Sequence, residues 1–402
     1  MEPSVISLDR ILLSVPHMSG LELRFVQEAF ASNWLSTVGP NLSELENCFQ
    51  TVLGQSAVAL SSGTAGLHLA LRLVGVRPGD EVVTQSLTFV ASANPILYEH
   101  ARPVLIDSDR VTWNLDPELL SKFLDQRARE NRLPKAVVLV HLFGQPAAIE
   151  EITAVCRRYE VALIEDAAES LGSRYQGRHP GTFGDVGVFS FNGNKMITGT
   201  TGGMLITSDP RNAVRARHWS TQARDTDPSG INNYLHTETG YNYRMSNVIA
   251  GIVRGQMEVL PSRVIQRRTV FERYSRALAQ IPGFEPQPDA PWATAGPESG
   301  SMPSNASYHS RWLSCFLVDE ALFGCSAPDL IRWLHQANVE ARPVWRPMHV
   351  QPLFAGAERI GGAVAEDLNA RGICLPSSSS LTLEDQEFVI ARILEAHFSV
   401  KS

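Results

Sequence analysis

The chain has 402 residues and a formal net charge of -7, and charged side chains make up 19% of it. This length allows a large buried core and about two domains. The acidic balance without a clustered basic run excludes the usual signature of a nucleic-acid-binding protein, and the lack of an apolar run of about 18 residues excludes a membrane-spanning helix. The five cysteines are scattered and form no C-x-x-C pair, so we expect a reduced, cytoplasmic protein with neither a disulfide framework nor a metal site. Charged residues interrupt the short apolar stretch at the start, so we expect no signal peptide.

The N-terminal part of the chain predicts two amphipathic helices joined by a polar loop. Apolar residues recur at helical spacing in 18–32, for example Leu21 and Phe25, and again in 42–49. The loop between the two helices contains Thr37. Its hydroxyl groups and flexible backbone fit either a plain turn or a loop that contacts a substrate.

A strand, a glycine-bearing turn and a helix then follow one another. The apolar Ala57–Leu60 leads into SSGTAG at 61–66 and on into LHLALRLVGV. This order directs the free N–H groups and the positive end of a helix dipole toward the turn, where an anion such as phosphate can bind. The hydroxyl of Thr64 can contribute to that site or can simply cap the helix. No Gly-Lys-Ser/Thr follows, so the turn is not a Walker loop.

Short apolar strands next alternate with helical stretches. The predicted strands are 80–84, 102–107, 136–141, 161–165 and 186–191, and the predicted helices include 117–126 and 150–159. This alternation predicts an α/β fold whose mainly parallel sheet is covered by helices on both faces. Phe89 lies just past the first of these strands, where an open α/β sheet binds its ligands. Its ring can stack on a flat cofactor or can belong to the core.

Two residues of unusual chemistry follow the last two strands of this series. Asp166 ends VALIED, and a buried carboxylate there needs a partner such as a positively charged ring nitrogen, unless it caps the next turn. Lys195 lies in a glycine-flanked turn after 186–191 and is one of only four lysines among 35 basic residues. Burial favours the neutral, nucleophilic amine, and only lysine offers a primary amine for a Schiff base. We therefore expect Asp166 and Lys195 to converge on one crevice, the ordinary alternative for a lysine being a solvated surface position.

Beyond residue 206 the pattern becomes helical, and a polar loop leads to GYNYRMSN at 240–247. Asn242 in this segment fits a phosphate contact, an interface contact or merely the start of a helix. A long helix is predicted over 246–278, and we expect it to continue past Pro261.

The remainder of the chain predicts a small α+β domain. Its strands are expected at 311–317 and 339–343, and its helices at 327–336 and 383–397. The segment 283–308, rich in proline, serine and glycine, predicts an extended, mobile connection or insertion. We place the domain boundary near residue 260. Residues 1–260 then hold the N-terminal helices and a large α/β domain, and residues 261–402 hold the long helix, the insertion and the small domain.

In their order and spacing, four blocks of this sequence resemble the DegT/DnrJ/EryC1/StrS family of sugar aminotransferases. The blocks are SSGTAGLHLAL, EDAAES, SFNGNK with its trailing TTGGM, and GYNYRMSN. The resemblance covers nearly the whole chain. It implies a pyridoxal 5'-phosphate enzyme of fold type I, with a mainly parallel seven-stranded-type sheet in the large domain and a small α+β C-terminal domain.

The resemblance also implies roles for individual residues. Lys195 would form the Schiff base with the cofactor and carry protons, Asp166 would pair with the protonated pyridine nitrogen, and Phe89 would stack on the ring. Asn242 would reach the phosphate from a neighbouring subunit, which implies a homodimer with shared active sites. Glu169 stands where relatives often have glutamine or histidine, close to cofactor and substrate. The cofactor contacts implied at the helix start and strand end are Gly63, Thr64, Ala65 and Ser190.

For the substrate, WLSTVGP and RPVWRPMHVQPLF resemble the branch that aminates C4 of UDP-linked 4-keto-6-deoxy-N-acetylhexoses for glycan or polysaccharide biosynthesis. The implied amino donor is L-glutamate, and Thr37 and His349 are the candidates for the sugar pocket. Enzymes that make GDP-perosamine carry a similar Arg-Pro…Pro-Met-His pattern, so a GDP-linked sugar stays open as an alternative, as does a 3-keto sugar. Some relatives replace the lysine by histidine and perform dehydration, and Lys195 argues against that branch.

Two other classes of function are compatible with parts of the pattern. The first is an amino-acid lyase, desulfurase or decarboxylase of the same fold, although no cysteine lies in an evident active-site loop, as a desulfurase would need. The second is a non-catalytic regulatory protein that binds the cofactor. Lys195 and Asp166 together would be hard to explain in such a protein, and no helix-turn-helix or basic patch supports DNA binding.

Overall fold

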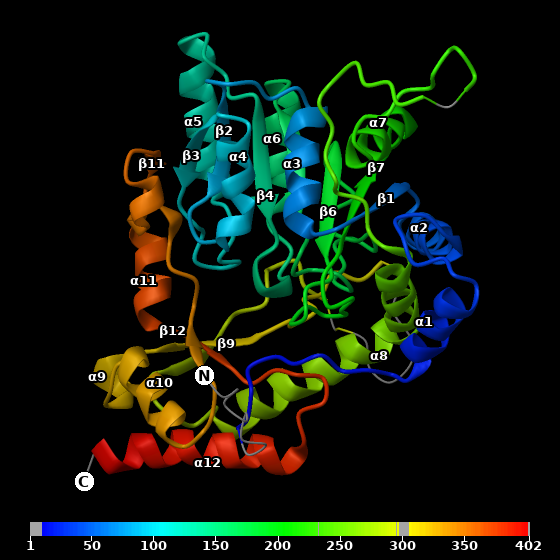
Figure 1. Cartoon of the computed structure of the whole chain (residues 1–402). Helices are drawn as coiled ribbons and strands as arrows, with labels where there is room; N and C mark the ends of the chain where they lie inside the picture. The colour runs from blue at the N-terminus through cyan, green and yellow to red at the C-terminus, as the bar shows by residue number, and fades with distance from the viewer. Residues whose placement is uncertain (1–9, 232, 295, 297–304, 401–402) are drawn as a thin grey trace.

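The computed structural model describes residues 10–231, 233–294, 296 and 305–400. At its centre lies an eight-stranded sheet of order β1-β7-β6-β5-β4-β2-β3-β11 (Figure 1). All neighbouring pairs are parallel except the two that β7 makes with β1 and β6. The strands are β1 Ser56–Leu60, β2 Glu81–Gln85, β3 Arg102–Ile106, β4 Ala136–Val140, β5 Ala162–Asp166, β6 Val186–Ser190, β7 Gly203–Thr207 and β11 Glu358–Ile360. The predicted mainly parallel sheet is confirmed, and β11 from the C-terminal part adds an eighth strand to it.

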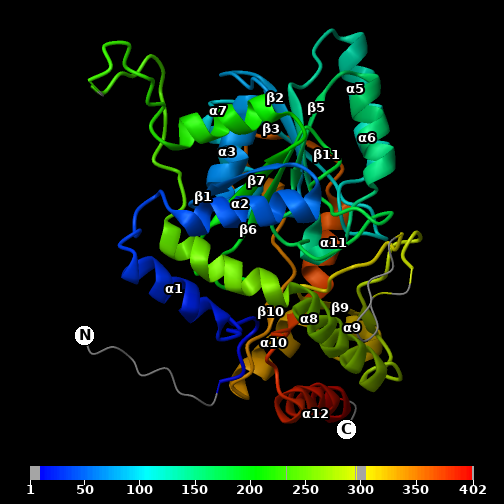
Figure 2. The same ribbon diagram turned by 90° about the vertical axis from the view of Figure 1, so that its right-hand side faces the viewer.

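Helices cover both faces of this sheet, as Figures 1 and 2 show. Alternating side chains explain why both faces are apolar: Val82 on β2 packs toward α3 and α4, whereas Val83 packs toward α5 and α6. The helix α7 joins the first face, and α2 with the first half of α8 covers the second face near β1, β6 and β7. These helices are α2 Pro40–Leu53, α3 Gly63–Leu73, α4 Asn94–Tyr98, α5 Pro117–Arg129, α6 Ile149–Arg158, α7 Pro210–Ser220 and α8 Asn247–Ala277.

A second, antiparallel sheet of order β10-β12-β9-β8 lies beside the first. Its core is shared with the last turns of α8 and with α10 and α12, whose apolar faces meet around Phe316. The strands are β8 Phe284–Pro286, β9 Ser314–Val318, β10 Arg342–Pro343 and β12 Gly372–Leu375. The helices of this part are α9 Glu320–Phe323, α10 Ala327–Gln336, α11 Ala363–Arg371 and α12 Leu383–Val400.

Two features tie the sheets together. Helix α8 is continuous through Pro261 and packs on both cores, so it spans the domain boundary expected at residue 260, which stays a prediction. The carboxylate of Asp107, at the end of β3, accepts the backbone N–H groups of Gly362, Val364 and Ala365 at 2.6, 3.0 and 2.8 Å. It thereby caps α11, because the first N–H groups of a helix have no partner within the helix.

Three expected elements differ from the structure. The strand expected at 339–343 is reduced to β10, because the backbone of Val339 pairs instead with Ile11 in the N-terminal segment. The strand expected at 311–317 starts only at Ser314, since Arg311 has a left-handed φ of 55°. Within the segment 283–308, Phe284–Pro286 forms β8 with a buried Phe284 and is not a free connection. Residues 295 and 297–304 of that segment lie outside the described residues.

The helix α1 Leu21–Ala31 and the helices α2, α3, α8 and α10 follow the predicted patterns closely. In α1 the side chains of Phe25 and Ala29 are buried against α8, as the apolar spacing indicates. Across the described residues, no helix combines the length and the apolar character needed to cross a membrane.

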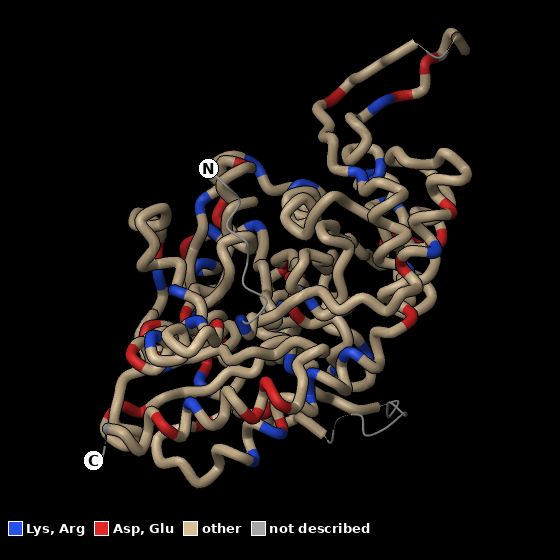
Figure 3. Tube along the Cα trace, turned by 60° about the horizontal axis from the view of Figure 1, so that its bottom comes forward, with Lys and Arg blue, Asp and Glu red and all other residues tan. Residues whose placement is uncertain are grey.

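The described part of the segment 222–240, which is 222–231 and 233–240, projects from the body of the molecule beyond α7 (Figures 1 and 3). One isolated bridge between Asp225 and Leu235 joins its two sides. Ile231 and Tyr234 near its tip are 78% and 73% exposed. Figure 3 also shows basic and acidic residues interspersed over the trace.

His179 generates a prediction about the pH dependence of stability. Its ring is 5% exposed, neither ring nitrogen has a hydrogen-bond partner among the described residues, and burial lowers its pKa from 6.5 to about 3. Below pH 6.5 the unfolded chain therefore binds a proton at this residue, whereas the folded chain binds it only near pH 3. The free energy of unfolding consequently falls as the pH drops through that range, by about 1.4 kcal/mol per pH unit.

We expect His179→Leu, which keeps a similar volume, to remove this contribution. The free energy of unfolding of the variant should then fall less steeply than that of the wild type between pH 6 and pH 4, as measured by urea titration at several pH values. Parallel curves for the two proteins would contradict the assignment.

Candidate active site

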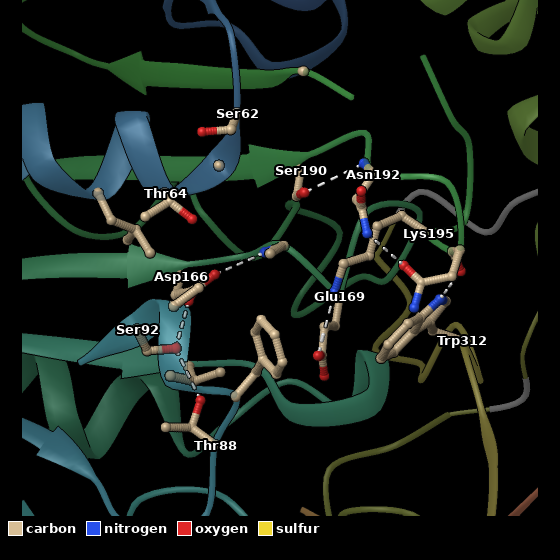
Figure 4. Close-up of a pocket in the computed structure, with 18 of the residues that line it drawn as sticks. Ser62, Thr64, Thr88, Ser92, Asp166, Glu169, Ser190, Asn192, Lys195 and Trp312 are labelled. Atoms are coloured by element: carbon tan, nitrogen blue, oxygen red, sulfur yellow. Dashed lines mark hydrogen bonds and ion pairs between the residues drawn. The ribbon is translucent and has the colours of Figure 1, made fainter. Parts of the chain in front are cut away.

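One pocket collects most of the residues singled out by the sequence. It lies at the carboxyl ends of β5 and β6 and at the start of α3 (Figure 4). The described residues that line it are Ser62, Gly63, Thr64, Leu67, Thr88, Phe89, Ala91, Ser92, Val140, Asp166, Ala168, Glu169, Ser190, Asn192, Asn194, Lys195, Thr201, Gly202, Trp312 and Trp345. Strands that are neighbours in the sheet therefore bring Asp166 and Lys195 to the same cavity, as predicted.

Lys195 reaches the pocket from a short turn that follows β6. Its side chain is 12% exposed, and its Nζ lies 3.4 Å from Oε1 of Glu169 and 4.1 Å from the ring centroid of Trp312. A carboxylate and an aromatic face thus flank the amine on the inner side of the pocket. The alternative of a solvated surface lysine is wrong.

Glu169 is almost fully buried beside this amine. Its Oε2 accepts the backbone N–H of Phe143 at 2.8 Å, from a residue whose φ of 55° is left-handed. Burial raises the pKa of Glu169, and the neighbouring Lys195 opposes that rise. The carboxyl group therefore holds a proton to higher pH than an exposed glutamate does, which suits a group that exchanges protons with an amine.

Asp166 forms the acidic end of the pocket. Its side chain is 4% exposed, and Oδ2 accepts a hydrogen bond from the Oγ of Ser92 at 2.7 Å, which in turn lies 2.8 Å from the Oγ1 of Thr88 (Figure 4). Its Oδ1 accepts the N–H of Ala168 at 3.1 Å. The carboxylate thus caps its own turn and also faces the cavity, so the cap does not exclude a ring nitrogen as partner, and that pairing stays a prediction.

The start of α3, where the sequence predicts an anion site, lines the pocket. Ser62 is the N-cap, since its Oγ accepts the N–H of Ala65 at 3.0 Å. Thr64 lines the pocket, as does Ser190 at the end of β6 (Figure 4). Ala65 does not line the pocket, and its N–H is already used by the cap; its contact with a phosphate stays a prediction.

Glycine at 203 makes this arrangement possible. A Cβ at Gly203 would lie 2.5 Å from the backbone carbon of Ser62 and 2.6 Å from the amide nitrogen of Gly63. Because two backbones meet there, no side chain can move aside to make room. Because residue 203 has no side chain, β7 can pack directly against the start of α3.

The aromatic residues around the pocket differ from the expected set. Phe89 is 51% exposed and lines the cavity, so it does not belong to the core; its ring centroid lies 5.6 Å from that of Trp345. Trp312 and Trp345 also line the cavity, and the sequence interpretation missed both. Trp345 lies in the segment VWRPMHVQPLF that was singled out for His349, so an indole beside that motif was an available signal.

Besides Ala65, three predicted residues do not line the pocket of this chain. Thr37 is half-buried in the loop before α2. His349 is held between the Oγ of Ser86 at 2.6 Å and Oε1 of Glu366 at 2.9 Å, through Nδ1 and Nε2 respectively. Asn242 pairs through its backbone with Thr221. Their assigned roles stay predictions.

The model of the DegT/DnrJ/EryC1/StrS aminotransferase family matches residues 16–394. The chain belongs to this family.

The similarity to named relatives and to solved structures covers nearly the whole chain. EpsN of Bacillus subtilis, whose name assigns it to the pyridoxal phosphate-dependent aminotransferases, is 45% identical over 98% of this chain and 97% of its own. GDP-perosamine synthase of Caulobacter vibrioides is 35% identical over 96% and 98%. The crystal structure of the aminotransferase TlmJ from Streptoalloteichus hindustanus superposes with a TM-score of 0.84 at 31% identity, over 98% of this chain and all of that one.

The family member is thus a pyridoxal phosphate-dependent aminotransferase, with the fold of the sugar aminotransferases. The residues of the pocket fit this cofactor. Lys195 offers the amine, Asp166 a buried carboxylate for the ring nitrogen, and the start of α3 an anion site where Gly203 keeps two backbones close. The half-exposed ring of Phe89 presents a flat surface to the same cavity.

The contact at Gly203 can be tested with a glycine pair. We expect Gly203→Ala to push β7 away from the start of α3, to lower the free energy of unfolding by about 1–3 kcal/mol as overpacked sites do, and to weaken pyridoxal phosphate binding. The measurements are a denaturant titration and an absorbance titration with the cofactor.

Gly193→Ala is the matched control, since Gly193 lies in the turn before Lys195 and a Cβ there meets no atom within 4 Å. Its free energy of unfolding should stay close to that of the wild type. Equal losses in the two variants would show that the close contact at Gly203 is not the cause.

Proposed function

We propose that this enzyme transfers an amino group from L-glutamate to the C4 keto group of a nucleotide-linked 4-keto-6-deoxy sugar, most simply a UDP-linked N-acetylhexose, in glycan or polysaccharide biosynthesis. The observation that carries the proposal is the meeting of Lys195 and Asp166 in one pocket that the start of α3 also lines. The chain's membership of the sugar aminotransferase family supports it.

Each residue of the pocket has a definite part in this proposal. Lys195 would hold the cofactor through its amine, and the same amine, when free, would carry a proton to and from the substrate carbon. Asp166, oriented by Ser92, keeps the ring nitrogen protonated. Phe89 would offer its ring to the flat face of the cofactor. Gly63, Thr64 and Ser190 would hold its phosphate. The cofactor, when bound, supplies the electron sink that makes the substrate proton removable.

Glu169 completes the proton path in this proposal. Its raised pKa and its 3.4 Å approach to Nζ of Lys195 allow the carboxyl group to share a proton with the amine. The Phe143 N–H fixes the other carboxyl oxygen, so Glu169 points at the amine and not along the cavity wall. The mechanism would be ping-pong, because the keto acid formed from the donor must leave before the keto sugar enters and receives the amino group.

A GDP-linked sugar is the second candidate substrate. It is favoured by the 35% identity with the GDP-perosamine synthase of Caulobacter vibrioides over nearly the whole of both chains. The two candidate substrates differ in their nucleotide base, and the residues of the cofactor pocket do not discriminate between the two bases. Thr37 and His349 are proposed for the sugar side. His349, held by Ser86 and Glu366, would act by fixing the loop that carries Trp345.

A homodimer with shared active sites is part of the proposal. Asn242 lies outside the pocket of its own chain, so it can contact a phosphate only in a second copy. The flanking Tyr241 and Tyr243 stack on each other at 4.8 Å, next to His68 of α3. Exposed apolar side chains on α1 and the loop after it offer a surface for such a copy; they are Leu23, Phe30, Trp34 and Val38.

The role of Lys195 is testable by colour and by mass. We expect the wild-type holoenzyme to absorb in the visible range and to bind pyridoxal phosphate irreversibly at Lys195 on borohydride reduction, because a lysine imine is reducible. Lys195→Ala should lose the band, and Asp166→Ala should lose turnover. Peptide mapping that finds the label on Lys122 or Lys135 would disprove the assignment.

The substrate is testable by competition between nucleotides. Incubation with L-glutamate should convert the visible band to that of the aminated cofactor, and a UDP-linked 4-keto-6-deoxy-N-acetylhexose should restore it and yield a 4-amino sugar by mass and NMR. Restoration by the GDP-linked 4-keto sugar alone would favour the second candidate. Restoration by neither sugar, or no response to glutamate, would count against sugar transamination with this donor.

A further inference from the structure

The peptide group that leads into Lys195 is held by two hydrogen bonds from distant parts of the chain. The carbonyl oxygen of Asn194 accepts the Oγ of Ser14 at 2.8 Å and the indole Nε1 of Trp312 at 2.7 Å. This carbonyl and the amide nitrogen of Lys195 belong to one planar peptide group. The two donors therefore fix the direction in which the lysine leaves its turn.

Trp312 also contacts the other end of the lysine. The Nζ of Lys195 lies over the face of the indole ring, 4.1 Å from its centroid, and the face of an aromatic ring attracts a cation. One side chain thus touches both the backbone that enters Lys195 and the amine that ends it. A displacement of Trp312 would move the amine relative to Glu169, which lies 3.4 Å away.

A single guanidinium holds both donors. Nη2 of Arg267, in the middle of α8, donates to the Oγ of Ser14 at 3.0 Å, and Nη1 donates to the backbone oxygen of Trp312. The rigid planar fork of arginine can serve two such acceptors at once, which the single ammonium of lysine cannot do in the same geometry. Arg267 therefore links α8, the N-terminal segment and the chain before β9 directly behind the turn of Lys195.

Burying the guanidinium of Arg267 at this position costs free energy. It is 1% exposed, no carboxylate among the described residues lies within ion-pair distance, and its Nε has no hydrogen-bond partner there. Burial, with a contribution from Arg263, lowers its pKa to about 9. Since a buried charge without a counter-charge costs free energy, stability alone does not account for an arginine at this position.

We propose that Arg267 is a positioning residue for Lys195, acting through the hydroxyl of Ser14 and the indole of Trp312, which together grip the Asn194 carbonyl. The proposal rests on the role of Lys195 in the proposed function. Loss of Arg267 frees both donors, so the lysine amine is no longer held at one place above the Trp312 ring. Misplacement by about 1 Å is enough to cost on the order of 10²-fold in rate.

The test compares two buried arginines of the same helix. Arg263 lies one turn before Arg267, is 5% exposed, and donates to the backbone oxygen of His17 in the N-terminal segment. Among the described residues it makes no hydrogen bond to Ser14, Trp312 or Asn194. Arg263→Met therefore removes a similar link between α8 and the N-terminal segment and leaves the hydrogen bonds of Ser14 and Trp312 to the Asn194 carbonyl in place.

We expect Arg267→Met to attach pyridoxal phosphate to Lys195 on the order of 10²-fold more slowly than the wild type and to lose kcat by a similar factor with little change in KM. Arg263→Met should attach the cofactor at the wild-type rate. Arg267→Lys should behave like Arg267→Met, since the charge without the fork is not enough. Attachment is followed by the growth of the visible band after mixing apoprotein with cofactor, and folding by thermal melting.

Single-donor variants keep the test decisive if Arg267→Met does not fold. Ser14→Ala and Trp312→Phe each remove one bond to the Asn194 carbonyl and should slow attachment roughly fivefold to tenfold, whereas Ser14→Thr, which keeps the hydroxyl, should not. Wild-type attachment rates in Ser14→Ala and Trp312→Phe, or equal rates in the two arginine variants, would overturn the proposal. If Lys195→Ala keeps the visible band, the proposed function fails first; if it loses the band, a negative result concerns Arg267 alone.

Discussion

The parallel pairing of β5 with β6 is the constraint on which the site depends. Asp166 is the last residue of β5 and pairs with Val188, so the acid stands at a fixed height on the sheet. The chain must then leave β6 and turn beside it, which delivers Lys195 to the same cavity. Both side chains are charged or reactive and both are largely buried, and only the backbone register of two apolar strands brings them together. The start of α3 lines the same cavity.

Local signals explain how much of this the sequence could predict. The alternation of apolar strands with amphipathic helices predicts the parallel sheet, because strands buried on both faces read as unbroken apolar runs. Asp166 and Lys195 stand out because each is a polar residue at the end of such a run. The position of Phe89 just past β2 likewise indicates the ligand side of the sheet, and the half-exposed ring confirms that it is not a core residue. In each case the relevant neighbours are close in sequence.

What the sequence could not predict depends on contacts between remote segments. Ser14 and Trp312 meet the Asn194 carbonyl across 180 and 118 residues, and no pattern around either residue points to that oxygen. The resemblance implies a place for His349 in the sugar pocket, which stays a prediction, and no local pattern indicates that its two ring nitrogens contact Ser86 and Glu366. The same reason shortens the strand expected at 339–343, whose partner is the N-terminal segment. Local propensity thus predicts the type of an element, whereas contacts with segments remote in the sequence determine where the element ends.

The position of β11 has a consequence for how the chain is made. β11 pairs with β3, and the carboxylate of Asp107 holds α11 directly after it, although some 250 residues separate the partners. Until the ribosome has released this late segment, β3 presents an unpaired, apolar edge of the kind that recruits other chains. Glu358 on β11 then brings its carboxylate to the buried guanidinium of Arg127. The last strand of the eight-stranded sheet to be synthesised thus removes the hazard of intermolecular strand pairing that β3 creates.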